Sequence, residues 1–180
     1  MILIVDLCYK KNSLSQREFV LPIASIVKKA GEDFEIRHYR EIREKDLEKC
    51  EKVILCGTAL KDNGYLKNMD KLQWMKNFEK PVLGICAGMQ VVGLVFGAEL
   101  EKKKEIGMTE IKIRKENKLF SSDLNVYELH GFSLKNLENF EVLAESEKCI
   151  QTIKHKQKEI YGIMFHPEVR QRQVVENFLI

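Results

Sequence analysis

A cysteine between two glycines is the first feature of the sequence that suggests chemistry. In "GICAGMQ", Cys86 lies between Gly84 and Gly88, where the apolar run "KPVLGIC" ends. A strand that stops there and a helix that begins near Ala87 would hold the thiol on a tight turn, as in a nucleophile elbow. The helix N-terminus favours a thiolate, and its free N–H groups can stabilise an oxyanion. The pattern indicates a nucleophile that attacks a carbonyl, although a small cysteine buried in the core fits this stretch equally well.

A nucleophilic cysteine needs a base, and one of the four histidines has a suitable context. His166 lies in "GIMFHPEV", where the following proline favours an extended backbone. Residues i and i+2 of an extended segment project to one side, so Glu168 is expected to orient the imidazole. This predicts a cysteine, histidine and glutamate triad. His38, between charged residues, and His155, in a charged turn, are expected on the surface.

Composition and charge exclude several classes of protein. The chain has 180 residues, of which 44% are hydrophobic, and we expect one domain over residues 1–180. No apolar stretch approaches the length of a membrane span, and "MILIVDL" meets charge too early for a signal peptide, so a cytoplasmic protein is expected. The net charge of +3 is mild, and Lys102–Lys104 are flanked by glutamates, which argues against nucleic-acid binding.

The cysteine spacing gives no reason to expect a metal or a disulfide framework. The five cysteines are scattered, without the paired spacing of a zinc site, and no phosphate-binding loop is present. We therefore expect no metal and no cofactor, and any ATP chemistry would belong to a partner. Four cysteines are expected to be reduced packing residues, with Cys56 the best placed of them for another role: Cys8, Cys50, Cys56 and Cys149.

The elements around these residues indicate an α/β fold. Strands without in-and-out alternation are separated by helices, which is typical of an open, mostly parallel, flavodoxin-like sheet with helices on both faces. Ligands bind such sheets at the carboxyl ends of the strands, where Gly57 and Cys86 fall. The second half reads as antiparallel strands. Strands are predicted at 1–7, 33–39, 51–57, 80–86, 108–120, 124–132, 140–146 and on either side of a turn at 154–159, and helices at 15–30, 44–50, 65–78 and from about 170.

Together, "GICAGMQ" and "FHPEV" resemble the class I glutamine amidotransferases over nearly the whole chain. The resemblance implies that Cys86 attacks the side-chain amide of glutamine, with His166 as base and acid and Glu168 holding His166. It also implies backbone oxyanion donors from Ala87 and from the loop after the third strand. Gln90 matches a glutamine that lines the family's substrate site.

Two segments depart from the family pattern. Where Ser-Gly-Gly-Pro is common, this chain keeps Gly57 but has Thr58 in place of the second glycine. A β-branched residue resists positive φ, so the Thr58 N–H serves the oxyanion only if its peptide turns the right way, and activity is expected to be low until a partner rearranges the loop. In "YELHGFSL", Leu129 replaces the usual Ser or Asn. The adjoining residues resemble a segment that binds glutamine mainly through its backbone: His130, Gly131 and Phe132.

The resemblance implies a separate synthase subunit that receives ammonia. The stretch from residue 140 to 169 most resembles the stand-alone glutaminase subunit of archaeal GMP synthase, whose partner would be an ATP-pyrophosphatase. The stretches "CGTAL" and "ELHGFSL" and the short tail depart from that subfamily. Two other readings stay open: a noncatalytic amidotransferase-like subunit, and a γ-glutamyl or peptide hydrolase on the same scaffold.

Overall fold

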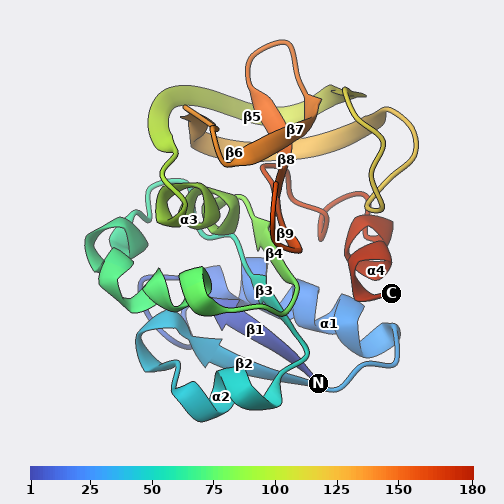
Figure 1. Ribbon diagram of the computed structural model, residues 1–180. Coiled ribbons are helices and arrows are strands. Elements are labelled where there is room, and N and C mark those ends of the chain that lie inside the picture. The colour runs from blue at the N-terminus through green and yellow to red at the C-terminus, as the bar shows by residue number, and fades with distance from the viewer.

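A computed structural model describes the whole chain, residues 1–180, and shows a mixed sheet between helices (Figure 1). The strand order is β2-β1-β3-β4-β9-β8-β7-β5-β6. The strands are Ile2–Asp6 (β1), Phe34–His38 (β2), Lys52–Leu55 (β3), Val82–Ile85 (β4), Glu99–Ile113 (β5), Leu124–Lys135 (β6), Phe140–Glu145 (β7), Ile150–His155 (β8) and Ile160–Ile163 (β9). The helices are Gln16–Val20 (η1), Leu21–Lys29 (α1), Tyr39–Glu41 (η2), Glu44–Lys49 (α2), Gly64–Asn77 (η3), Ala87–Val95 (α3) and Gln173–Leu179 (α4).

The first half of the sheet is parallel and buried on both faces, as its apolar strands require. Strands β1, β2, β3, β4 and β9 all pair in parallel. Helices α1 and α4 contribute to the core on one face, and η3 and α3 contribute to the core on the other. The carboxyl ends of β3, β4 and β9 therefore meet at one edge, where the sequence predicts the site.

The second half is antiparallel, as predicted. Strands β7 and β8 extend the sheet from β9, and β5 and β6 form a long hairpin that lies across the end of α3 in Figure 1. Together with the parallel half, this confirms the α/β class with an antiparallel extension. No helix combines the length and the apolar character needed to cross a membrane.

Several element predictions were only partly right. The helix predicted over residues 65–78 is a run of 3₁₀ turns with a break at Asn68, where φ is −131°. The predicted helix at 15–30 begins as a π-helical turn, η1. The strand predicted from Met108 begins at Glu99 instead, so that Lys102–Lys104 lie on an exposed part of β5.

The prediction that His38 and His155 lie on the surface was wrong, because both are buried. The Nε2 atom of His38 lies 2.8 Å from the carbonyl oxygen of Cys8, so a backbone group satisfies the ring. The ring of His155 packs edge-on between Phe96 and Phe140. Burial, with nearby lysines, lowers the pKa of His155. Charged neighbours in sequence concealed these positions because strand side chains alternate between faces.

Candidate active site

Cys86 occupies a strained turn between β4 and α3. Its φ is 50° and its ψ is −105°, a conformation that costs a non-glycine residue of order 1–3 kcal/mol. The turn is held by a hydrogen bond from the Cys86 N–H to the carbonyl of Ile163, 2.8 Å, and by one from the Gln90 N–H to the carbonyl of Cys86, 3.1 Å. The predicted elbow is therefore present, and the surrounding fold maintains its strain.

The two glycines that flank Cys86 allow the helix to pack directly on the strands. A Cβ on Gly84 would lie 2.5 Å from the carbonyl carbon of Gly88. A Cβ on Gly88 would lie 2.3 Å from the carbonyl oxygen of Leu55 in β3. Any side chain at either position would push α3 away from the sheet and displace the turn, so the spacing of the glycines is a packing requirement.

His166 and Glu168 form a buried pair just after β9. The Nδ1 atom of His166 lies 2.7 Å from Oε1 of Glu168, and the two side chains are 1% and 2% exposed. The His166 N–H donates to the carbonyl of Tyr127 in β6, 2.9 Å, and the ring of Phe19 packs on the imidazole with centroids 5.3 Å apart. The ring is thus fixed in place, and its Nε2 atom is buried without a hydrogen-bond partner.

The pKa of His166 reflects two opposing effects. Burial lowers this pKa, because an imidazolium is poorly solvated in the interior. The negative charges of Cys86 and Glu168 outweigh burial and hold the pKa well above its ordinary value of 6.5. This balance favours the protonated form of the His166 ring.

Gly57 connects the turn of Cys86 to the ring of His166. A Cβ built on Gly57 would lie 2.8 Å from Cε1 of His166 and 3.5 Å from Cβ of Cys86. The backbone at the end of β3 therefore touches both the cysteine and the histidine. The three strand ends bring Gly57, Cys86 and His166 into one cluster.

The cavity beside Cys86 is very small. Its volume is about 20 Å³, enough for roughly one water molecule. Cys86 is 4% exposed, and its thiol donates to the carbonyl of Leu129, with Sγ and O 3.6 Å apart. The lining residues are Thr58, Ala59, Leu60, Asp62, Asn63, Tyr65, Cys86, Ala87, Gln90, Leu129, His130, Gly131 and Phe132.

The loop that carries Thr58 is held down by one carboxylate. Oδ2 of Asp62 accepts from the Thr58 hydroxyl at 2.7 Å and from the Tyr9 N–H at 2.6 Å, and Oδ1 accepts from the Gly64 N–H at 3.1 Å. Thr58 has no positive φ, and its N–H makes no backbone hydrogen bond. The Ala87 N–H is at the start of α3, where helical N–H groups have no partner within the helix. Both predicted oxyanion donors therefore line the same cavity.

Gln90 lines the cavity as expected, but its side chain is already engaged. Its Oε1 accepts from the Tyr65 hydroxyl at 2.5 Å, and its Nε2 donates to the carbonyl of Phe132 at 3.3 Å. Gln90 therefore ties η3 and β6 to α3. Sequence reasoning missed Tyr65 and Asp62, because no motif marks them and only the fold of the 58–65 segment brings them here.

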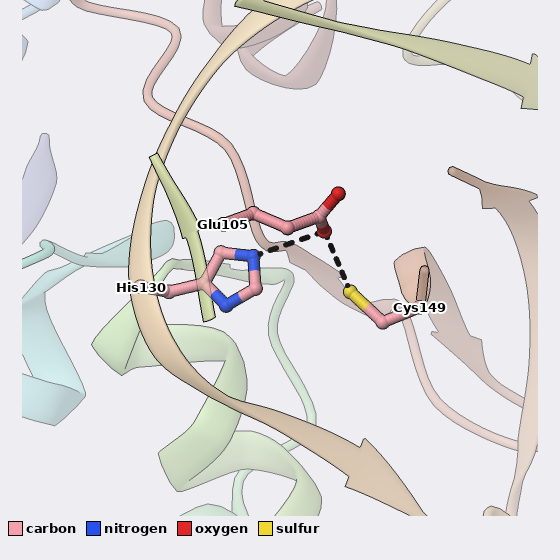
Figure 2. Close-up of side chains that lie close together, drawn as sticks. All are labelled: Glu105, His130 and Cys149. Carbon is pink, nitrogen blue, oxygen red and sulfur yellow. Dashed lines mark hydrogen bonds and ion pairs between the residues drawn. The ribbon is translucent and has the colours of Figure 1, made fainter. Parts of the chain in front are cut away.

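Of the predicted substrate segment, His130 also lines the cavity, but its ring contacts another group of residues. Its Nε2 lies 3.4 Å from Oε2 of Glu105 and 3.3 Å from Oε2 of Glu128. Figure 2 shows the ring directed toward Glu105 and Cys149. Gly131 and Phe132 follow it along the cavity wall.

This elbow, triad and fold define a class of protein, and the chain belongs to the family described as glutamine amidotransferase class-I, whose pattern matches residues 16–180. Similar proteins carry more particular names. A glutamine-hydrolysing GMP synthase subunit of Methanosphaera stadtmanae is 46% identical over 114 residues, 57% of this chain and 61% of that protein. The GMP synthase subunit of the same name from Pyrococcus abyssi is 37% identical over 130 residues, 68% of each chain. The chain thus matches 61% of the length of the first relative.

A solved structure is similar over almost the whole chain. A protein of Thermoplasma acidophilum, provisionally assigned as a GMP synthase subunit, has a TM-score of 0.86 and 27% identity, covering 99% of this chain and 91% of that one. A glutamine amidotransferase of Thermotoga maritima shares the fold, with a TM-score of 0.74 and 24% identity.

Proposed function

We propose that this chain hydrolyses glutamine to glutamate and ammonia through a thioester on Cys86. The observation that carries the proposal is the buried His166–Glu168 pair, 2.7 Å between Nδ1 and Oε1, which lies with Cys86 against Gly57. Family membership and the names of the relatives support the same reaction.

The proposed reaction uses His166 to move the proton in both halves. The Cys86 thiol gives its proton to Nε2 of His166, and the thiolate attacks the amide carbon of the glutamine side chain. The tetrahedral oxyanion receives hydrogen bonds from the backbone N–H groups of Ala87 and Thr58. The carbon–nitrogen bond breaks, and ammonia leaves with the proton from His166. Water then attacks the thioester and His166 takes its proton. The carbon–sulfur bond breaks as glutamate forms, and His166 returns the proton to the sulfur of Cys86.

Glu168 acts through His166 rather than on the substrate. Its Oε1 accepts from Nδ1–H, which leaves Nε2 free for proton transfer and stabilises the imidazolium. If the ring proton were on Nε2 instead of Nδ1, Nε2 could not accept the proton of the Cys86 thiol.

The small cavity implies that glutamine enters only after the 58–63 segment moves. A volume of about 20 Å³ does not hold an amino acid, and the hydrogen bonds to Asp62 hold this segment in place. A surface cavity of about 520 Å³ shares Ala59, Asp62 and Asn63 with the inner one. We therefore propose that the isolated chain has low activity and that a synthase subunit opens this segment.

We propose that the ammonia is delivered to a GMP synthase, the enzyme for which the relatives are named. The proposed partner is an ATP-pyrophosphatase subunit that aminates XMP. This chain would form a single glutaminase domain, and both subunits would act in the cytoplasm. The relatives named as glutamine-hydrolysing GMP synthase subunits support this assignment.

The test is alkylation by a diazo-ketone glutamine analogue, followed by intact mass and peptide mapping, with Cys86→Ala as control. An adduct on Cys86 alone, formed by the isolated chain or after adding an ATP-pyrophosphatase subunit with its nucleotides, supports the proposal. Absence of an adduct in both conditions would overturn it and favour a noncatalytic subunit. Turnover of γ-glutamyl peptides without glutamine turnover would favour the hydrolase reading.

A further inference from the structure

A second cluster of reactive side chains surrounds His130, which follows Leu129 in β6. Glu105 projects from β5, His130 from β6, and Cys149 directly precedes β8 (Figure 2). All three are buried, and one ligand atom from each lies within 4.8 Å of the others. Glu128, two residues before His130 on the same strand, is fully buried beside them.

Hydrogen bonds within the protein do not satisfy this cluster. Neither ring nitrogen of His130 has a hydrogen-bond partner, and neither carboxylate oxygen of Glu128 has one. Their side chains are both 0% exposed. Leaving such groups unpaired in the interior destabilises a protein, and more so when they are charged. These groups are therefore available to bind a further ligand.

The charge of the cluster suits a cation. Oε2 of Glu105 and Oε2 of Glu128 lie 3.4 and 3.3 Å from the same nitrogen, Nε2 of His130, and no lysine or arginine is in ion-pair contact with either carboxylate. The groups that donate to Glu105 are the neutral side chains of Ser146, Gln151 and Cys149.

The distances are close to those expected around a single tetrahedral ion. Two ligands bound 2.0–2.3 Å from one ion at a tetrahedral angle are roughly 3.3–3.7 Å apart. Here Nε2 of His130 lies 3.4 Å from Oε2 of Glu105, and Sγ of Cys149 lies 3.0 Å from the same oxygen. Oε2 of Glu128 is 3.3 Å from Nε2 of His130 and is the nearest further donor. Small shifts of side chains would bring these atoms to bonding distance.

We infer that Glu105, His130 and Cys149 bind a divalent transition-metal ion of the zinc class, with Glu128 as the nearest additional donor. A thiolate, an imidazole and a carboxylate are a donor set that zinc accepts, whereas magnesium and calcium prefer oxygen alone. Binding releases the thiol proton of Cys149 to solvent, and the negative charge on the ligands balances that of the ion.

The ion would fix a segment that also borders the nucleophile. His130 follows Leu129, whose carbonyl accepts from the Cys86 thiol. The ion would join β5, β6 and the start of β8 behind that carbonyl. Its role is structural, and it takes no part in glutamine hydrolysis.

The test measures zinc binding in the Cys86→Ala background, because the triad itself offers a thiol, an imidazole and a carboxylate. The folded, untagged chain is titrated with Zn²⁺ alone, and stoichiometry is read by native mass spectrometry. Binding of Co²⁺ is followed by its thiolate charge-transfer absorption. Cys149→Ser and Glu105→Gln remove one ligand each, and Cys50→Ser is the matched control, a buried free cysteine away from the cluster.

We expect one ion per chain, a thiolate-to-cobalt band, and loss of that band in Cys149→Ser. Zinc affinity should fall by at least about 100-fold in Cys149→Ser and Glu105→Gln, since losing even an outer-shell partner costs about 10–100-fold. Cys50→Ser should bind as tightly as its parent. The inference is overturned if the parent chain takes up no ion, or if its cobalt complex shows no thiolate band. These two measurements need no ligand variant, so they decide the matter even if the variants do not fold. Unchanged affinity in folded Cys149→Ser would overturn it too.

Discussion

Gly57→Ala should displace the ring of His166 in a protein that still folds. The added Cβ would lie 2.8 Å from Cε1 of His166, against an ordinary carbon–carbon contact of about 3.5–4.0 Å. The ring or the end of β3 must therefore move by roughly 0.7–1.2 Å. Gly57 has no positive φ, so alanine adds this contact without backbone strain.

The expected cost has two parts. Overpacking of this kind destabilises a protein by about 1–3 kcal/mol, and each kcal/mol lowers Tm by about 2–4 °C in a chain of this length. A displacement of about 1 Å at a reacting group costs about 100-fold in rate. We expect alkylation of Cys86 by the diazo-ketone analogue to slow by about two orders of magnitude in a protein that still folds.

The matched control is Gly93→Ala in α3. Its Cβ would lie 2.5 Å from a methyl group of Leu134, an even tighter contact that the end of a flexible side chain can relieve. This variant should change Tm but alkylate at a rate close to that of the unaltered chain. If Gly57→Ala folds and alkylates at the unaltered rate, the argument that Gly57 sets the position of the ring is refuted.

Three further variants test the hydrogen bonds around the site. Glu168→Gln should lower the pKa of His166 and cost about 1.5–3 kcal/mol in urea unfolding. Because the folded-state pKa of His166 is raised, this loss should be full below pH 6.5 and should shrink as pH rises through the folded pKa; a constant loss would contradict the pairing. Thr58→Val removes the hydroxyl that holds the loop and should speed alkylation of the isolated chain roughly tenfold, with Thr58→Ser as the control that keeps the hydroxyl. Tyr65→Phe leaves Oε1 of Gln90 buried without its donor, which should lower the free energy of unfolding by about 1–3 kcal/mol and Tm by a few degrees in calorimetry. An unchanged Tm would show that the oxygen finds another partner.

The parallel half of the fold and the pair of motifs were predictable because their signals are local. Apolar runs at 1–7, 51–57 and 80–86 show no alternation, and only a sheet covered on both faces accommodates them. The glycines around Cys86 and the proline beside His166 restrict the backbone within a few residues. Local restrictions of this kind can be read from a single sequence.

The small size of the cavity beside Cys86 was less predictable, because it depends on hydrogen bonds that Asp62 makes across the loop. Asp62 holds Thr58 and the backbone of Tyr9, which is far away in sequence. The expectation that Thr58 would disturb the oxyanion loop rested on φ alone, whereas the structure adds a hydrogen bond from its hydroxyl. A side chain that accepts hydrogen bonds from residues far apart in the chain produces no periodic pattern in the sequence.

The grouping of His130 with Glu105 and Cys149 was not predicted, for a related reason. Glu105, His130 and Cys149 come from separate strands or their ends, and none of them forms a paired spacing. Cysteine spacing in the sequence reports only on neighbouring residues. The fold brings together side chains from β5, from β6 and from the residue before β8.

Strand β6 has consequences for how this protein can tolerate change. The carbonyls of Tyr127 and Leu129 hold His166 and face Cys86, while the side chains of Glu128 and His130 lie in the second cluster. Substitutions at Glu128 or His130 leave the backbone atoms at the triad in place, so the two sites can diverge independently by point mutation. Inserting or deleting one residue in β6 would exchange the two faces and abolish both at once. Homologous chains should therefore vary in the identity of these side chains far more readily than in the length of this strand.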